Sequence, residues 1–247
     1  MKKIYRAYFL LLLILFIVWY SFRIYTNNIL IIKASITTYP YAIFHSNDIV
    51  WKQPKKILMT ATANTFEDLA SWKADIIFVT EPNSYQYNLM NNSEKKIWLI
   101  PISTENVVVL VNKNNPISNI SSEDLKLIYT QDKDWSDFWW DNKPIISYQI
   151  AWWNWSATVF EKLVKWSRIN AQHIEEVYMD KLIDDLWNNV YGIWYAFQTF
   201  FSNMYPNDNL KIIKVNGLDP EDRNYLLKSN IFLWFDKDNG KIKNINL

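Results

Sequence analysis

Residues 144–164 read PIISYQIAWWNWSATVFEKLV, an extended run followed by a short polar loop and an amphipathic run. The apolar residues of 159–164 recur at helical spacing, so we expect a helix that begins near Ser156. The first backbone N–H groups of a helix have no internal partner, and the helix dipole favours negative charge beside them. A strand, a loop and a helix that begins with hydroxyl residues therefore predict an anion-binding site.

Tryptophans occupy positions where glycine is expected. The backbone of an anion-binding loop approaches its ligand closely and adopts unusual dihedral angles, which favours glycine, yet this loop carries Trp152, Trp153 and Trp155. Trp72 and Trp166 follow predicted helices, where a left-handed cap also favours glycine. The chain has 3 Gly and 14 Trp, which together match the roughly 17 glycines that an average usage of about 7% gives at this length.

We hypothesise that many of these tryptophan codons are UGA and that the source organism reads them as glycine. The alternative is a chain that is truly rich in tryptophan. The coding DNA separates the two hypotheses, because UGG codons at positions 72, 152, 153, 155 and 166 would contradict recoding.

Composition excludes several functional classes. The 247 residues suffice for one large domain or two small ones. A net charge of +1 gives no basis for a nucleic-acid partner. The absence of cysteine excludes disulfides, thiolate metal sites and cysteine nucleophiles, and His45 and His173 lack the spacing of a metal site. We therefore expect no metal and no cofactor.

The N-terminal segment has the layout of a secretory signal or a membrane anchor. Three basic residues precede the largely apolar run Ala7–Phe22, and Arg23 follows it. This charge pattern predicts that the rest of the chain lies outside the cytoplasm. The run is slightly short for a spanning helix and has no small-residue cleavage site. Residues 1–28 are therefore predicted to form an uncleaved membrane anchor, with a removed signal peptide as the alternative.

The rest of the chain alternates short strands with short helices. Such alternation, with apolar runs like Ala74–Thr80 (ADIIFVT), is typical of α/β domains with mostly parallel sheets. Ser121 and Ser122 form a good helix N-cap ahead of two acidic residues and an apolar face. Further strands are expected at Ile29–Ser35, Lys56–Thr60, Leu99–Ile102, Asn106–Asn112, Ile145–Gln149, Tyr191–Phe197 and Leu210–Val215, and helices at Thr65–Ser71 and Asp219–Ser229.

Polar residues gather at the predicted carboxyl ends of four strands. Ligands of open parallel sheets bind at that edge, where helices begin. Hydroxyls and helix N–H groups would hold the oxygens of a tetrahedral anion, and a carboxylate would accept the anion's own proton. The candidate binding residues are Thr37, Thr38, Thr60, Thr62, Thr80, Glu81, Ser156 and Thr158. The sequence has no nucleophile with a base, no metal cluster and no P-loop, so no catalytic residue is predicted.

Several segments, in order, resemble the phosphate-binding family of solute-binding proteins that serve ABC importers. With Gly read for Trp, Ala70–Asn83 becomes ASGKADIIFVTEPN and Gln149–Ser167 becomes QIAGGNGSATVFEKLVKGS. Val190–Phe197 becomes VYGIGYAF, and residues 115–140 contain NPISNISSEDLKLIYT and WSDFGG. Trp135 matches a true tryptophan of the family, so recoding would not apply to every tryptophan.

The resemblance spans residues 32 to 235 and implies a two-lobed type II periplasmic-binding-protein fold, with mostly parallel sheets and a ligand cleft between the lobes. It implies that lobe I comprises residues 29–112 and 199–247, and lobe II residues 113–198. The family usually has an arginine shortly before the loop at 155–158, and residues 150 to 155 contain none, which leaves the identity of the oxyanion open. The resemblance implies a phosphate-site loop of Trp155, Ser156, Ala157 and Thr158, beside the threonine loops and Glu81.

The sequence therefore predicts a binding protein and not an enzyme. We expect it to capture inorganic phosphate for the membrane subunits of an ABC importer, outside the cytoplasm, either anchored to the membrane or released. One alternative is a protein that binds another oxyanion, such as sulfate or molybdate. A second is a tryptophan-rich surface protein that binds sugars or peptides, and a third is a cell-surface hydrolase.

Overall fold

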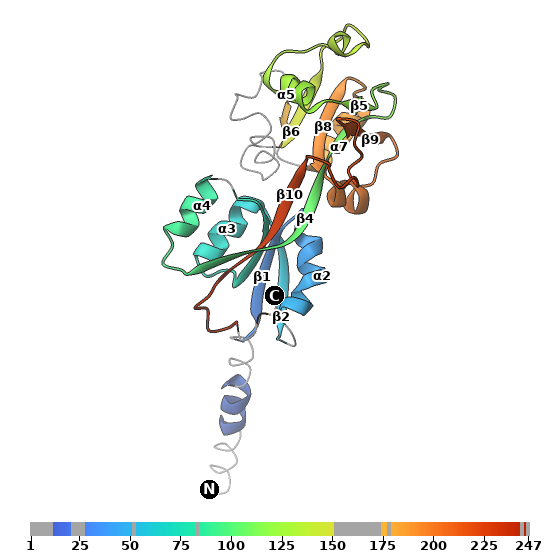
Figure 1. The fold of residues 1–247 in the computed structure, drawn as a ribbon. Helices are drawn as coiled ribbons and strands as arrows, with labels where there is room; N and C mark the ends of the chain where they lie inside the picture. The colour runs from blue at the N-terminus through green and yellow to red at the C-terminus, as the bar shows by residue number, and fades with distance from the viewer. Residues whose placement is uncertain are drawn as a thin grey trace, which may run out of the picture.

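The computed structural model describes residues 12–20, 28–50, 53–82, 84–150, 174–176, 179–242 and 245. Within them, ten strands form one connected sheet, because the long strand β4 (Ile97–Asn112) belongs to two smaller sheets. Figure 1 shows two lobes joined along β4 and its antiparallel partner β10 (Lys228–Asp236). This arrangement confirms the predicted two-lobed α/β fold.

The first lobe is built on three parallel strands. They lie in the order β2 (Lys55–Thr60), β1 (Leu30–Ser35) and β3 (Ile76–Thr80), and β10 follows β3 in the antiparallel direction. The three strands predicted at Ile29–Ser35, Lys56–Thr60 and Ala74–Thr80 are confirmed to within two residues at each end. Their carboxyl ends therefore meet at one edge of the sheet, as the sequence predicted.

Helices cover both faces of the first lobe's sheet because β3 is apolar on both sides. Ile76 and Phe78 pack into one hydrophobic cluster, and the alternate residues Ile77 and Val79 pack into another. A strand buried on both faces reads as an unbroken apolar run. The helices are α2 (Tyr39–Ile49) on one face, and α3 (Thr62–Ala70) and α4 (Ser84–Asn91) on the other (Figure 1).

The second lobe surrounds the far half of β4. There β4 pairs antiparallel with β8 (Gly192–Phe197) and β9 (Leu210–Val215). β8 is parallel to β6 (Ile146–Ile150), which is parallel to β7 (Ile174–Glu176), and β9 is parallel to β5 (Asn119–Ile120). The helices of this lobe are α5 (Ser122–Thr130), the 3-10 helix η1 (Trp135–Phe138), α7 (Met179–Asn188) and the π-helix η2 (Phe200–Met204).

The start of α5 confirms the predicted N-cap. The Ser121 hydroxyl accepts a 3.0 Å hydrogen bond from the backbone N–H of Asp124, which satisfies a donor of the first turn. Leu125, Ile128 and Tyr129 are buried in the core of the second lobe. Local capping and an apolar helix face therefore specify this helix together.

Two sequence predictions were wrong, and the first concerns the strand that joins the two lobes. The strands expected at 99–102 and 106–112 form the single 16-residue strand β4. Its polar residues Ser103, Thr104 and Glu105 pair with β10 where the chain passes from one apolar core to the other. The polar interval separated two apolar patterns in the sequence, whereas in the structure it is the part of one strand that lies between two cores.

The helix expected at 219–229 is absent, since these residues form turns and the first residues of β10. The Asp222 carboxylate accepts a 2.7 Å hydrogen bond from the Asp219 N–H, and the Tyr225 hydroxyl donates to the Val107 carbonyl at 2.8 Å. Aspartate side chains that bond nearby backbone groups compete with helix formation. Tertiary pairing and local turns therefore override the apparent helical pattern.

The predicted lobe boundaries stay a prediction, and the packing bears on residues 199–227. Phe200, Phe201, Tyr225 and Leu227 belong to the hydrophobic core of the second lobe. β9 pairs only with β4 and β5 among the described strands. On the basis of packing, residues 199–227 would therefore belong to the second lobe, and the chain would re-enter the first lobe at β10.

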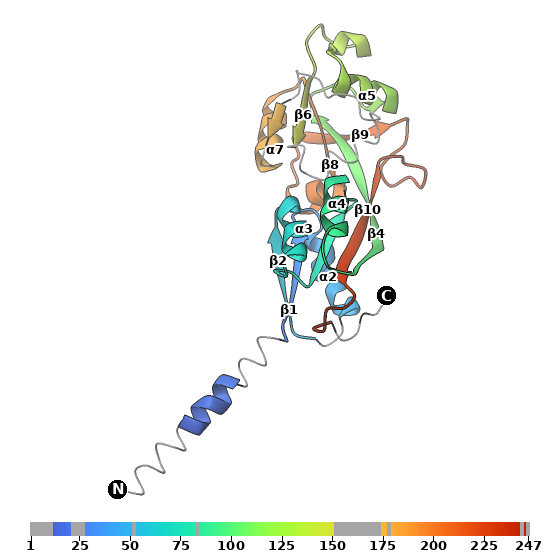
Figure 2. The ribbon, with the colours of Figure 1, turned by 90° about the vertical axis from the view of Figure 1, so that its left-hand side faces the viewer.

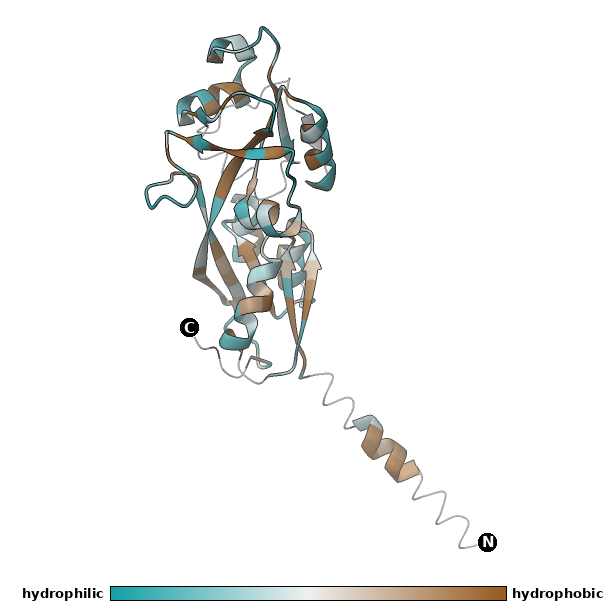
Figure 3. Ribbon diagram, turned by 90° about the vertical axis from the view of Figure 1, so that its right-hand side faces the viewer, coloured by the Kyte–Doolittle hydropathy of each residue, from teal (hydrophilic) through white to brown (hydrophobic). Residues whose placement is uncertain are grey.

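Residues 12–20 form an exposed helical segment that lies away from both lobes (Figure 2). Figure 3 shows hydrophobic residues along this segment as well as along β4 and β10. Among the described residues, no helix has both the length and the apolar character needed to cross a membrane. Most of the predicted anchor at 1–28 lies outside the described residues.

Candidate anion site

The carboxyl edge of the first lobe's parallel strands brings the predicted threonines together. Ser35, the last residue of β1, lies beside Thr60 of β2. On the other side of β1, Ala34 lies beside Phe78, so β3 ends two residues later at Thr80. Hydroxyl residues from three adjacent strands therefore stand at one edge, where ligands of α/β folds bind.

The turn after β1 is fixed by hydrogen bonds of its own side chains. The Thr38 N–H donates to the Ser35 carbonyl at 3.0 Å, and the Thr38 hydroxyl donates to the Phe78 carbonyl at 2.6 Å. The Ser35 hydroxyl oxygen lies 2.9 Å from that of Thr38 and 3.2 Å from that of Thr37. All three side chains are buried. The loop is thus pre-organised before any ligand binds.

This turn leads into the uncapped N-terminus of α2. Thr38 is the N-cap residue, and its side chain makes no capping hydrogen bond to the first turn, which contains Pro40. The first N–H groups of an 11-residue helix normally need a capping side chain, water or a ligand. Because the capping threonine bonds elsewhere, the helix end keeps its capacity to bind an anion.

The Thr80 hydroxyl is buried without a hydrogen-bond partner among the described residues. Burying a hydroxyl without a partner costs roughly 1–3 kcal/mol by mutational measurements. Few such groups persist in native proteins without a ligand, a water or a functional reason. Thr80 therefore has an unused donor and acceptor at the carboxyl edge.

Glu81 follows Thr80 and is partly buried. Burial, with a smaller contribution from the Glu81 carboxylate, raises the pKa of Tyr87 in α4. A carboxylate at the edge of an anion site suits a ligand that carries a proton of its own.

The remaining predicted site residues are less completely described. Thr62 begins α3, so its backbone lies at the same edge as Thr60. The positions predicted in the second lobe, Trp155, Ser156, Ala157 and Thr158, lie outside the described residues, as do Trp152, Trp153 and Trp166. β6 leads towards this segment and carries two buried polar side chains, those of Ser147 and Gln149. The Ser147 hydroxyl and the Gln149 carbonyl oxygen have no partner among the described residues.

Sequence reasoning missed Ser35, Ser147 and Gln149. Ser35 read as the final residue of an apolar strand, and the other two read as ordinary strand residues. The available signal was a polar residue inside an otherwise apolar strand, which is rarely buried without a partner or a function.

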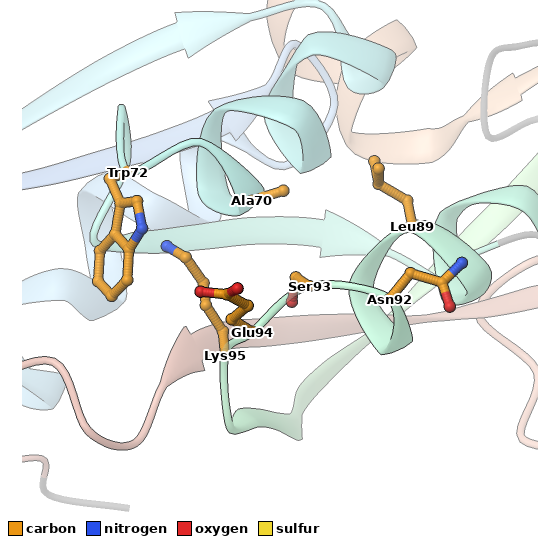
Figure 4. Close-up of a pocket in the computed structure, with 7 residues that line it drawn as sticks. All are labelled: Ala70, Trp72, Leu89, Asn92, Ser93, Glu94 and Lys95. Atoms are coloured by element: carbon orange, nitrogen blue, oxygen red, sulfur yellow. The ribbon is translucent and has the colours of Figure 1, made fainter.

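A separate cavity of about 330 Å³ lies at the opposite end of α3 (Figure 4). The Lys95 ammonium lies 3.4 Å from the ring centroid of Trp72 and donates to the Leu69 carbonyl. A cation at the last carbonyls of a helix is a normal capping arrangement. This cavity therefore has a structural explanation, and its lining residues are Ala70, Trp72, Leu89, Asn92, Ser93, Glu94 and Lys95.

Trp72 and Trp139 adopt left-handed backbone conformations, with φ of 64° and 67°. Trp72 follows the C-cap of α3 and Trp139 is the C-cap of η1, and both side chains are exposed. By contrast, Trp135 is fully buried and its indole N–H donates to the Tyr191 carbonyl at 2.9 Å. The described tryptophans thus include two at glycine-like positions and three, Trp135, Trp194 and Trp234, that are buried in the core.

Comparison with solved structures identifies the fold. A candidate phosphate ABC transporter substrate-binding protein with bound phosphate from Clostridium perfringens superposes with a TM-score of 0.68, at 14% identity over 85% of this chain and 86% of that one. An ABC-type phosphate transport receptor from Vibrio cholerae superposes with a TM-score of 0.60, at 15% identity over 85% and 88% of the two chains.

The chain has a periplasmic-binding-protein fold. The fold also occurs outside transport, because the reduced OxyR regulatory domain from Pseudomonas aeruginosa superposes with a TM-score of 0.56, at 13% identity over 84% of this chain and 88% of that one. No family model and no curated protein sequence matches the chain. At these identities the structural matches establish the fold and leave the ligand specificity open.

Proposed function

We propose that this protein is a solute-binding protein that captures inorganic phosphate between its two lobes. The observation that carries the proposal is the buried, unpartnered Thr80 hydroxyl at the edge that also holds the uncapped N-terminus of α2. Thr37 and Thr38 form the turn at this helix end, and Thr60 and Thr62 flank it on the next strand and helix. The second lobe would complete the site with Ser156, Ala157, Thr158 and position 155.

Phosphate suits these groups because it both accepts and donates hydrogen bonds. Its oxygens would accept from hydroxyls and from the N–H groups of the first turn of α2. Its own proton would be donated to Glu81. Fully ionised sulfate has no proton for that carboxylate, so Glu81 would repel it. This chemistry favours phosphate over sulfate even though no arginine precedes the second-lobe loop.

The names of two superposed proteins support a role in phosphate import. We therefore propose that the ligand is delivered to the membrane subunits of an ABC importer on the outer side of the cytoplasmic membrane. The N-terminal segment would serve as a membrane anchor or as a signal for export. The protein would not act as an enzyme, since its site offers hydrogen-bond donors and one carboxylate rather than a nucleophile with a base.

We further propose that tryptophan stands for glycine at part of its positions. The left-handed conformations of Trp72 and Trp139 support this proposal, because such conformations favour glycine. Trp152, Trp153 and Trp155 would then be glycines in the predicted anion-binding loop. Sequencing the codons for these positions tests the proposal, and UGG codons at all of them would contradict it.

Thr80→Val tests the proposed site, because it removes the unpartnered hydroxyl while keeping the side chain's shape. We expect ligand-free stability to be unchanged or increased, and the phosphate Kd to rise about tenfold, the effect of one hydrogen bond to a charged group. The matched control is Ser46→Ala, which removes another buried, unpartnered hydroxyl further along α2. Equal phosphate affinity in Thr80→Val and its parent would contradict the proposed site.

A further inference from the structure

Glu105 lies at the point of β4 where the chain passes between the lobes. It pairs with Ser229 of β10 on the side of the first lobe, and Val107, two residues later, pairs with Phe197 of β8 in the second lobe. Its side chain is buried, with 3% exposed. A buried carboxylate in a joint between two lobes requires partners, because an isolated buried charge is strongly unfavourable.

Three neutral donors hold the Glu105 carboxylate. The Tyr41 hydroxyl donates to one oxygen, which also accepts a 2.7 Å hydrogen bond from the Thr199 hydroxyl. The backbone N–H of Thr199 donates to the other oxygen at 2.9 Å. Among the described residues no cation forms an ion pair with Glu105 within 4.0 Å. Charge-assisted hydrogen bonds of this kind are shorter and stronger than neutral ones.

The donors come from opposite sides of the joint. Tyr41 lies in the first turn of α2, three residues after Thr38. Thr199 follows β8 and precedes η2, whose Phe200 is buried in the core of the second lobe. Glu105 therefore links the helix end of the proposed anion site to the second lobe.

We infer that Glu105 is a positioning residue that couples the N-terminus of α2 to the second lobe, so that phosphate affinity depends on both Tyr41 and Thr199. This inference rests on the proposed phosphate site. Holding the Tyr41 side chain fixes the direction in which the first turn of α2 presents its N–H groups. Holding Thr199 fixes the second lobe against the same carboxylate, so a ligand that needs both lobes benefits from the link.

A neighbouring polar group offers a matched control. Asn106 donates to the Gln198 side-chain carbonyl at 2.9 Å, and Gln198 donates to Glu221 at 2.5 Å. These residues join β4 to the chain after β8, as Glu105 and Thr199 do, but their hydrogen bonds among the described residues do not reach α2. Gln198→Met should therefore leave the phosphate Kd unchanged.

The test is a double-mutant cycle of Tyr41→Phe and Thr199→Val. The parents are the chain as printed and the chain carrying Trp152→Gly, Trp153→Gly and Trp155→Gly, and phosphate Kd is measured by titration calorimetry. Each single change should raise the Kd about tenfold. In the double variant the phosphate Kd should rise by much less than the roughly hundredfold that independent effects would give, because both residues act through one carboxylate.

Four outcomes would overturn the inference. Single effects that multiply fully would show that Tyr41 and Thr199 act separately. Lower melting temperatures with an unchanged Kd would show that Glu105 serves stability alone. Failure of both parents to bind phosphate would overturn the proposed function together with this inference. If a parent binds phosphate and its variants have the same Kd, this inference alone is overturned.

Discussion

The Thr38 hydroxyl donates a 2.6 Å hydrogen bond to the main-chain carbonyl of Phe78, so the turn after β1 is anchored to the strand beside it. Both residues are buried. The bond uses the hydroxyl that would otherwise cap α2, and it leaves the helix end to a ligand. One side chain thus both orders the loop and keeps the proposed anion site open.

Thr38→Val should destabilise the protein by about 1–3 kcal/mol, because the buried Phe78 carbonyl would lose its side-chain donor. Urea unfolding of the ligand-free protein measures this change. Thr130→Val is a suitable control, since among the described residues the Thr130 hydroxyl bonds only within its own helix, to the Lys126 carbonyl at 2.8 Å. Equal stabilities for the two variants would show that the Thr38 bond has no special role.

Replacing the left-handed tryptophans by glycine should stabilise the chain. Trp139→Gly should gain about 1–2 kcal/mol, the cost of a left-handed conformation for a residue with a side chain. Trp72→Gly should gain less, because it also removes the contact with Lys95, worth about 0.5–1 kcal/mol at an exposed site. Trp135→Gly should instead lose about 3–5 kcal/mol or more by emptying a core position.

Thermal unfolding of these three variants separates the two classes of tryptophan. A loss of stability in Trp139→Gly similar to that in Trp135→Gly would contradict the view that position 139 favours glycine. Codon sequencing gives an independent answer for each position.

The apolar strand patterns predicted β1, β2 and β3, and the pattern is clearest for β3, which is buried on both faces. Ala74–Thr80 is such a run, and β3 occupies Ile76–Thr80. The same reasoning failed at Glu105, whose polar neighbours suggested a break in β4. A polar residue inside a strand is informative only once its distant partners are known, and Tyr41 and Thr199 are 64 and 94 residues away.

The sequence predicted the part of the candidate site that consists of hydroxyl residues at the carboxyl ends of strands. Thr37, Thr38, Thr60 and Thr80 were found because hydroxyls at the carboxyl ends of parallel strands share one edge. The unpartnered state of Thr80 was not predictable, because hydrogen bonding depends on every neighbour that the fold brings close. The part of the site assigned to residues 155–158 stays a prediction.

Stability at alkaline pH should depend on Tyr41. Burial and the hydrogen bond to Glu105 raise its pKa to about 12, above the ordinary value of 10.0. The folded state therefore favours the neutral phenol, and its contribution is complete below pH 10.0 and is lost as pH rises towards about 12. Tyr41→Phe should make the urea-unfolding free energy less dependent on pH over this interval.

The buried Tyr129 and Tyr225 also have raised pKa values, so some alkaline destabilisation should remain in Tyr41→Phe. An identical pH dependence in Tyr41→Phe and its parent would contradict the assignment.

Glu81→Gln should weaken phosphate binding about tenfold and reduce discrimination against sulfate, because it removes the charged acceptor of the phosphate proton. Competition between the two anions at neutral pH measures both effects. Glu94 lines the cavity at the other end of α3, so Glu94→Gln should change neither phosphate affinity nor discrimination against sulfate. An unchanged phosphate-to-sulfate ratio in Glu81→Gln would remove the basis for choosing phosphate.

Titration calorimetry with phosphate, on the printed chain and on the chain carrying Trp152→Gly, Trp153→Gly and Trp155→Gly, tests the central claim most directly. Three indoles beside the proposed anion position would occupy the space that the ligand needs. We predict weak binding by the printed chain and restored binding, with phosphate preferred over sulfate, by the glycine form. Equal phosphate affinity in the two forms, or a preference for sulfate, would contradict the account.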